Sequence, residues 1–71
     1  MKITLNGIDH EIEQKSISYD GIIEMATGKA STDIWSMVFL RKNGKEGSMK
    51  RPERIRLDEG LIINVHRTDN S

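Results

Sequence analysis

The chain has 71 residues, and its 11 basic and 11 acidic side chains give a formal net charge of zero. It contains no cysteine, which excludes disulfides, thiolate metal sites and a cysteine nucleophile. The length predicts one domain with one modest core, and the apolar run at the start is too short for a signal peptide or a membrane span. We therefore expect a soluble protein of the cytoplasm.

Charge is unevenly distributed along the chain. Residues 1–40 carry three lysines against six acids, a net of −3, and residues 57–71 have a net of −2. Residues 41–56 carry a net of +5, from two acids and seven basic residues: Arg41, Lys42, Lys45, Lys50, Arg51, Arg54 and Arg56. Opposite local fields of this kind favour binding to a charged partner or to another copy of the chain.

The first predicted element is a hairpin. Residues 2–5 alternate polar and apolar, and Asn6-Gly7 follows as a strong turn signal, because both central residues of a type I′ turn need positive φ. A two-residue turn pairs Leu5 with Ile8 and Met1 with Ile12. The face predicted to cover the core then consists of Met1, Ile3, Leu5, Ile8, His10 and Ile12.

Residues 17–28 have the features of the single helix. Ser18 is a suitable N-cap, and Gly28 suits the left-handed residue that ends a helix. Gly21 is the weak point, since glycine in a helix interior costs about 1 kcal/mol against alanine. The apolar stripe, with spacings of three and four residues, consists of Tyr19, Ile22, Ile23 and Ala26. So short a helix needs a sheet to pack on.

Residues 34–40 read as a strand rich in β-branched and aromatic residues. We place its aromatic residues inward with Met37. That phase leaves three apolar residues partly exposed as a candidate contact patch: Ile34, Val38 and Leu40. The alternative is a strand buried on both faces.

The second half of the chain reads as short strands and turns. Residues 42–47 form a turn, residues 48–50 a short strand, and Pro52 interrupts the ladder because it has no N–H. The run 61–66 is predicted to be the central strand, buried on the face that carries Leu61, Ile63 and Val65. The polar residues 67–71 read as a flexible tail.

These elements predict an α+β fold in which a mixed sheet of four to five strands packs on one helix. The first and last strands are expected to lie parallel and adjacent in the middle, since the segment between them can hold the helical crossover that parallel strands require. This arrangement is the ubiquitin-like β-grasp architecture, with the domain at residues 1–66 and the tail at 67–71.

Several stretches carry a resemblance to a known family. Ile-Thr-Leu-Asn-Gly at 3–7, Trp-Ser-Met-Val-Phe at 35–39 and Gly-Leu-Ile-Ile-Asn-Val-His-Arg-Thr-Asp-Asn-Ser at 60–71 resemble the small bacterial ubiquitin-like proteins related to multiubiquitin domains. Those proteins are encoded beside activating-enzyme, conjugating-enzyme and metallopeptidase homologues. The resemblance spans nearly the whole chain. It implies a protein modifier that is activated and attached through its C-terminus, with these three enzymes as partners.

The resemblance also bears on the tail, where Asp69, Asn70 and Ser71 stand in place of the Gly-Gly end of ubiquitin. In the resembled family a small residue after a C-terminal Asn can be trimmed. The resemblance therefore implies that Ser71 is removed and Asn70 becomes the linked residue. If the resemblance is set aside, residues 69–71 are equally consistent with an ordinary disordered terminus.

No catalytic, metal or cofactor site is expected. His10 falls in the inward phase of the hairpin, and His66 lies among polar residues. Neither histidine has a cysteine or carboxylate at ligand spacing. Ser18 is explained as a helix cap, and the glycines are scattered at turns instead of forming a phosphate loop. We expect a protein that is not an enzyme.

The basic stretch 41–56 leaves several interpretations open: a solvated face, a surface that docks on an acidic enzyme, or a nucleic-acid site. The three aromatic residues argue against nucleic acid, because the core needs them and none is left for base stacking. Self-assembly is a further alternative, since basic and acidic regions of two copies can meet head to tail. The chain thus reads either as a modifier, or as a non-conjugated binding module or structural subunit.

Overall fold

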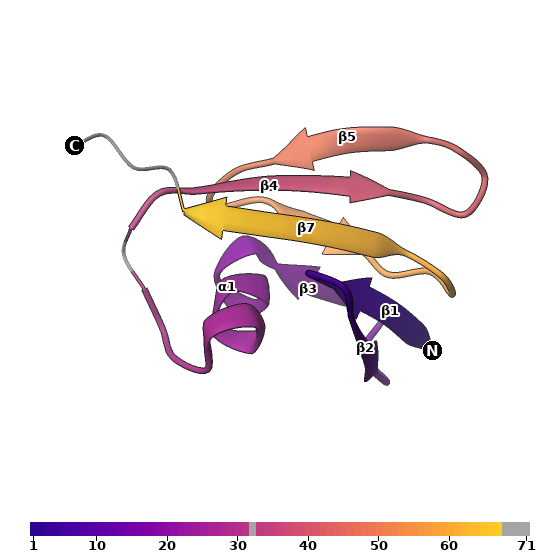
Figure 1. Cartoon of the computed structure of the whole chain (residues 1–71), viewed down its shortest axis with the longest axis horizontal. Helices are drawn as coiled ribbons and strands as arrows, with labels where there is room; N and C mark the ends of the chain where they lie inside the picture. Colours follow the sequence, from indigo (N-terminus) through magenta and orange to yellow (C-terminus); the bar gives the residue numbers. More distant parts are fainter. Residues whose placement is uncertain (32, 68–71) are drawn as a thin grey trace.

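The computed structural model describes residues 1–31 and 33–67, which form one mixed five-stranded sheet, one helix and a small second sheet (Figure 1). The large sheet has the strand order β2-β1-β7-β4-β5, and β3 pairs with β6 in the small sheet. The elements are β1 (Lys2–Leu5), β2 (Ile8–Glu11), β3 (Ser16–Ser18), α1 (Tyr19–Thr27), β4 (Trp35–Leu40), β5 (Glu46–Met49), β6 (Arg54–Arg56) and β7 (Ile62–Arg67). This confirms the predicted α+β, ubiquitin-like β-grasp architecture.

The first hairpin has the predicted register. Asn6 and Gly7 take φ values of 51° and 81°, and β1 pairs with β2 so that Leu5 lies opposite Ile8. One inward residue was predicted wrongly, because Ile8 is 63% exposed. Strand β2 is an edge strand of the sheet. Its first residue, Ile8, is therefore exposed to solvent, although Leu5, the residue opposite it, is buried.

Strand β7 occupies the centre of the large sheet, as predicted. It runs parallel to β1, with Thr4 opposite Ile62, and antiparallel to β4. The turn residue Asn6 reinforces the parallel pair, because its side-chain Oδ1 accepts a hydrogen bond from the N–H of Val65 at 2.7 Å. Leu61, Ile63 and Val65 are buried on one face. The first and last strands are therefore neighbours, joined by a connection that contains the helix.

The helix begins and ends where the sequence predicted. Ser18 caps it by accepting a hydrogen bond from the N–H of Gly21 at 3.0 Å, and Gly28 takes the left-handed conformation with φ of 83°. Gly21 has a packing reason to be glycine: a Cβ there would lie 2.9 Å from Cγ1 of Ile17. The close approach of the helix to the preceding strand offsets the low helix propensity of glycine.

The small sheet is an element that the sequence reading missed. It pairs Ile17 with Ile55, and both side chains are buried. Backbone hydrogen bonds from Leu57 to Lys15 and from Tyr19 to Glu53 continue the pairing at its two ends. Strands of three residues are too short to show an alternating pattern. Ile17, predicted only to precede the helix cap, therefore lies within β3.

The turn between β4 and β5 is tighter than predicted. The N–H of Arg41 donates to the carbonyl of Lys45 at 2.7 Å, and the N–H of Gly44 donates to the carbonyl of Arg41 at 2.9 Å. Strand β5 consequently starts at Glu46, two residues before the predicted start at Ser48.

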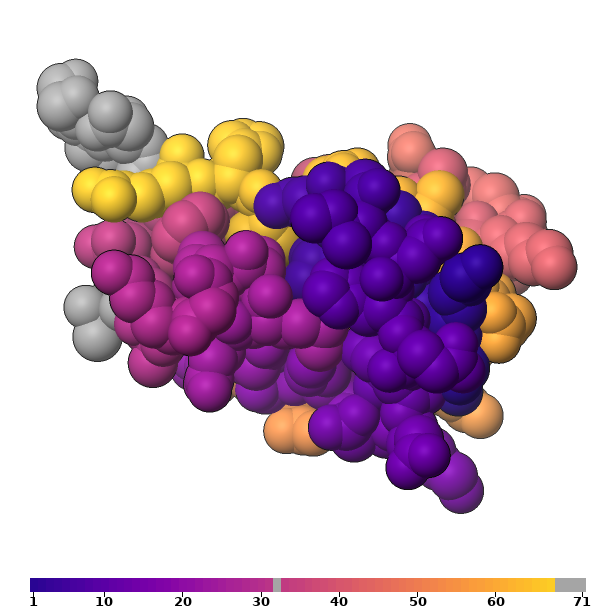
Figure 2. Space-filling model, turned by 60° about the horizontal axis from the view of Figure 1, so that its bottom comes forward, coloured from indigo at the N-terminus to yellow at the C-terminus, as the bar shows by residue number. Residues whose placement is uncertain are grey.

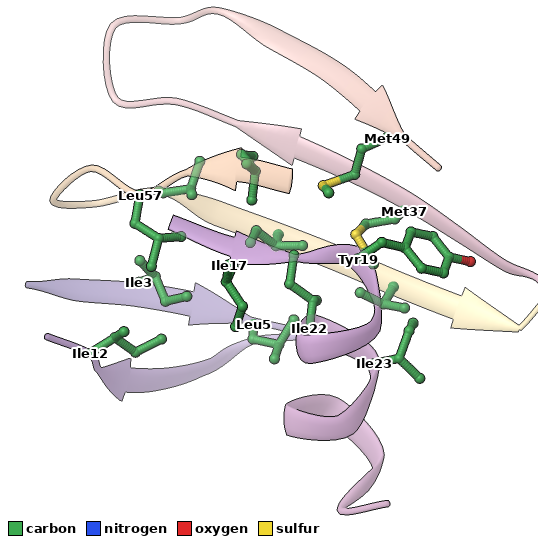
Figure 3. Close-up of a cluster of buried hydrophobic side chains, with 14 residues drawn as sticks. Ile3, Leu5, Ile12, Ile17, Tyr19, Ile22, Ile23, Met37, Met49 and Leu57 are labelled. Atoms are coloured by element: carbon green, nitrogen blue, oxygen red, sulfur yellow. The ribbon is translucent and has the colours of Figure 1, made fainter. Parts of the chain in front are cut away.

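A single hydrophobic core lies between the large sheet, the helix and the small sheet (Figure 3). Figure 2 shows the first residues of the chain, in indigo, next to the purple and magenta region that includes the helix. Tyr19 links the helix to β4, because its hydroxyl donates to the carbonyl of Trp35 and accepts from the N–H of Trp35, both at 2.7 Å. The buried side chains are Ile3, Leu5, Ile12, Ile17, Tyr19, Ile22, Ile23, Met37, Met49, Ile55, Leu57, Leu61, Ile63 and Val65.

Candidate interaction surface

The face of the large sheet that points away from the helix carries an apolar patch. Because side chains alternate along a strand, the residues between the buried ones share this outer face. Leu40 of β4 lies directly opposite Ile62 of β7, and Val38 is two residues from Leu40 on the same face. These three residues, which we call the outer apolar patch, are 39%, 36% and 43% exposed, respectively.

The predicted contact residues lie only partly together. Val38 and Leu40 are exposed as predicted, so the alternative of a strand buried on both faces is wrong. Ile34 is also exposed, at 63%, but it precedes β4 and lies about 13 Å from Val38 along the chain, with Ser36 between them. Ile62 was missed, although the alternation that buries Leu61 and Ile63 also turns the residue between them outward.

A shallow groove runs along the outer face beside this patch. Apolar side chains of Val38 and Leu40 line one side of it, and Glu46, Ser48 and Asn64 supply polar groups. A groove of this kind can hold an apolar side chain of a ligand, and its few polar groups can orient that ligand.

The side chain of Arg41 is held by contacts within the protein and is not a free part of the basic surface. Its guanidinium group pairs with the carboxylate of Asp58 and donates to the carbonyl of Arg56 at 3.1 Å. It also lies 5.3 Å from the centre of the Phe39 ring, within range of a cation–π interaction. Arg41 therefore ties the end of β4 to the segment that follows β6.

Arg51 has a similar role at the other end of the sheet. Its Nε donates to Asp20 at 2.8 Å, and its terminal nitrogens donate to the carbonyls of Ser31 and Asp33 at 3.3 Å. The guanidinium group stacks 4.7 Å from the Tyr19 ring. One side chain thus joins the start of the helix, the loop after it and the segment between β5 and β6.

The other five residues of the predicted basic surface are exposed. Arg54 donates to the hydroxyl of Ser16 at 3.3 Å, and none of the five forms an ion pair with an acid in the part of the chain that the structure describes. They are Lys42, Lys45, Lys50, Arg54 and Arg56.

A second groove separates the edge of β5 from β6. Three arginines, Arg41, Arg54 and Arg56, line it together with Phe39, Ser48, Met49, Glu53 and Ile55. Strand β5 therefore lies between two grooves, an apolar one on the outer face and a basic one on the helix side.

The predicted conjugation residues Asp69, Asn70 and Ser71 lie outside the described residues. Strand β7 continues to Arg67, one residue beyond the predicted domain boundary at residue 66. Arg67 is exposed, and its Nε lies 3.7 Å from a carboxylate oxygen of Asp33.

The two histidines stay apart in the fold. His10 is half-buried in β2 opposite Ile3, and His66 is exposed in β7 opposite Ser36. Across residues 1–31 and 33–67, no three histidine or acidic side chains are grouped to hold a metal ion, and no helix is long and apolar enough to cross a membrane.

Comparison with known proteins identifies one family. A family model described as Multiubiquitin matches residues 1–69, which include every helix and strand of the structure. Neither the curated proteins nor the solved structures provide a match.

Proposed function

Because the chain belongs to the Multiubiquitin family, and is therefore a ubiquitin-like domain, we propose that it is a protein modifier of a bacterial conjugation pathway. The observation that carries the proposal is the position of β7. This strand is the centre of the large sheet, and its last described residue, Arg67, is exposed. Arg67 is thus a strand end that is paired within the sheet, opposite Trp35, and exposed to an approaching enzyme.

The proposed chemistry uses the domain as a substrate. An activating enzyme joins the C-terminal carboxylate to the AMP part of ATP and releases pyrophosphate. A thiol of the enzyme then displaces AMP, and an amine of the target displaces that thiol to form an amide. The body of the domain contributes recognition, for which the outer apolar patch is the best-formed surface.

Processing of the C-terminus is part of this proposal. The resemblance of residues 68–71, Thr-Asp-Asn-Ser, to the ends of the small bacterial ubiquitin-like proteins implies removal of Ser71 by a metallopeptidase, which leaves Asn70 as the linked residue. The intact mass of the protein after incubation with the partner peptidase tests this step. We expect the loss of one serine; an unchanged mass, with a peptidase that cleaves a control substrate, contradicts it.

A binding module that is never conjugated is the second candidate. The outer apolar patch supports it, because such a surface binds a partner whether or not the C-terminus reacts. Nucleic acid fits less well, since Tyr19 is buried and Trp35 and Phe39 are half-buried against the core.

Detection of covalent adducts separates the two candidates. The protein is tagged at its N-terminus, expressed in its native host and compared with a variant that lacks residues 68–71. We expect adducts of higher mass that survive denaturation in the full-length protein and disappear in the shortened one. The absence of adducts while the activating enzyme is expressed, or adducts that persist in the shortened variant, would contradict the modifier proposal.

A further inference from the structure

We propose that the free edge of β5 binds an extended segment of a partner protein as an added strand, and that this segment alternates acidic and β-branched apolar residues. This non-covalent site is independent of the conjugation proposal. Three features of β5 support it: an unpaired backbone edge, the basic groove on its helix side and the apolar groove on its outer side.

The backbone of β5 is available for pairing at two residues. Strand β5 ends the large sheet, so only one of its edges faces β4. The hydrogen bond from the N–H of Arg41 to the carbonyl of Lys45 fixes the alternation of the ladder. Gly47 and Met49 therefore direct their N–H and C=O groups to β4, whereas Glu46 and Ser48 direct theirs to the free edge.

The free edge stops after Met49. The next residue with outward backbone groups is Lys50, and both groups are already used by Glu53. The N–H of Lys50 donates to the Glu53 carboxylate at 2.7 Å, and its carbonyl accepts from the N–H of Glu53 at 2.8 Å. The open window thus comprises the backbone groups of Glu46 and Ser48, which suits a short added strand.

On the helix side, this window borders the basic groove. The Phe39 ring lies over Gly47 so closely that a Cβ on Gly47 would be 2.9 Å from its Cζ. Beyond the ring, Arg54 and Arg56 line the groove without an ion pair among the described acids. Side chains of an added strand that point to this side meet guanidinium groups, which bind carboxylates with charge-assisted hydrogen bonds.

On the outer side, the same window borders the apolar groove. Ser48 lies directly opposite Val38 and is small, so a long side chain from an added strand can lean over it toward Val38. Successive residues of a strand point to opposite faces. A segment that satisfies both grooves therefore alternates acidic residues, for the arginines, with apolar residues, for the outer groove.

A second copy of the chain fits this edge poorly. The other free edge of the sheet is β2, where the paired backbone bonds between Met1 and Ile12 leave Asp9 and Glu11 with outward backbone groups. Their side chains lie on the outer face, as does that of Glu46. Pairing β2 with β5 of another copy would bring acids together on one face, which destabilises a strand pair.

Fluorescence anisotropy with synthetic peptides tests the inference. The probe is a labelled peptide Glu-Val-Glu-Val-Glu-Val with blocked ends. The controls are Glu-Glu-Glu-Val-Val-Val and Lys-Val-Lys-Val-Lys-Val. We expect saturable binding of the alternating acidic peptide only, weakened by salt as ion pairs at a surface are. No saturation with that peptide, or equal binding of Glu-Glu-Glu-Val-Val-Val, would overturn the proposal.

Two test variants, each with a matched control, locate the site. R54Q/R56Q removes the guanidinium groups and is expected to weaken binding about tenfold, whereas K2Q/K29Q removes the same charge elsewhere and is expected to leave binding nearly unchanged. S48P removes one outward N–H and no bond to β4, and is expected to weaken binding about five- to tenfold, whereas S48A keeps that N–H and binds as the unaltered protein does.

Circular dichroism establishes that each variant is folded before binding is measured. Undiminished binding in both R54Q/R56Q and S48P overturns the site. Displacement of the peptide by poly(U) RNA at equal charge concentration assigns the groove to nucleic acid and also overturns it. So does a dimer in sedimentation that S48P abolishes, because the edge would then belong to a second copy.

Discussion

The two isoleucines at the start of β7 point to opposite faces of one sheet. Ile63 is fully buried, at 0% exposure, among the core side chains, whereas Ile62 is 36% exposed beside Leu40. The comparison shows how one residue type serves two purposes in a small domain. On the helix side it contributes to folding stability, and on the outer side it forms part of the surface that we propose contacts partners.

The largest expected loss of stability comes from truncating Ile63, the buried one of these two isoleucines. I63A removes core methylenes next to the helix and is expected to lower the free energy of unfolding by about 3 kcal/mol. I62A is expected to cost about 1 kcal/mol or less, because part of that side chain is already in water. Chemical denaturation followed by Trp35 fluorescence measures both. Equal losses of unfolding free energy in I63A and I62A would contradict the assignment of Ile63 to the core and of Ile62 to the exposed face.

A second, smaller contrast sets Arg51 against Arg56. R51Q removes contacts to Asp20, to two loop carbonyls and to the Tyr19 ring, and is expected to cost about 1 to 2 kcal/mol of stability. The partly exposed ion pair within this set contributes little by itself. R56Q breaks no side-chain hydrogen bond or ion pair among the described residues and is expected to stay within about 0.5 kcal/mol of the unaltered protein. The same denaturation measurement decides, and similar values for both would refute the structural role of Arg51.

The smallest expected difference in stability is that between alanine substitutions at two serines, Ser18 and Ser48. S18A removes the helix cap and is expected to cost about 1 kcal/mol, whereas S48A on the outer face is expected to be nearly neutral. Thermal unfolding of the two variants side by side provides the check. A neutral S18A would mean that the helix start is held by β3 alone.

Much of the fold was predictable because its signals are local. Asn6-Gly7 defined the first hairpin, Ser18 and Gly28 defined the helix, and alternation identified the buried face of β7. The small sheet was not predictable, since three residues carry no period. The exposure of Ile8 follows from its place on the edge strand β2, and the strand order of the sheet cannot be read from the pattern of one hairpin.

The candidate site was predictable only in part. Exposure of Val38 and Leu40 followed from the phase of one strand, and Ile62 was open to the same reasoning. The intramolecular partners of Arg41 and Arg51 were not predictable, because a run of charges in the sequence does not show which acids lie near it in the fold. Arg51 pairs with Asp20, 31 residues away, and Arg41 pairs with Asp58, 17 residues away. The free edge of β5 needs the register of the whole sheet, which only the structure provides.

Recognition of the modifier is proposed to use the outer apolar patch. The most direct test is the yield of covalent adducts from L40S/I62S in the native host, with folding checked by circular dichroism. We expect a folded protein whose adducts fall about tenfold, because the buried face is untouched while the contact surface is lost. A folded L40S/I62S protein that forms adducts at the yield of the unaltered protein would contradict this role of the patch.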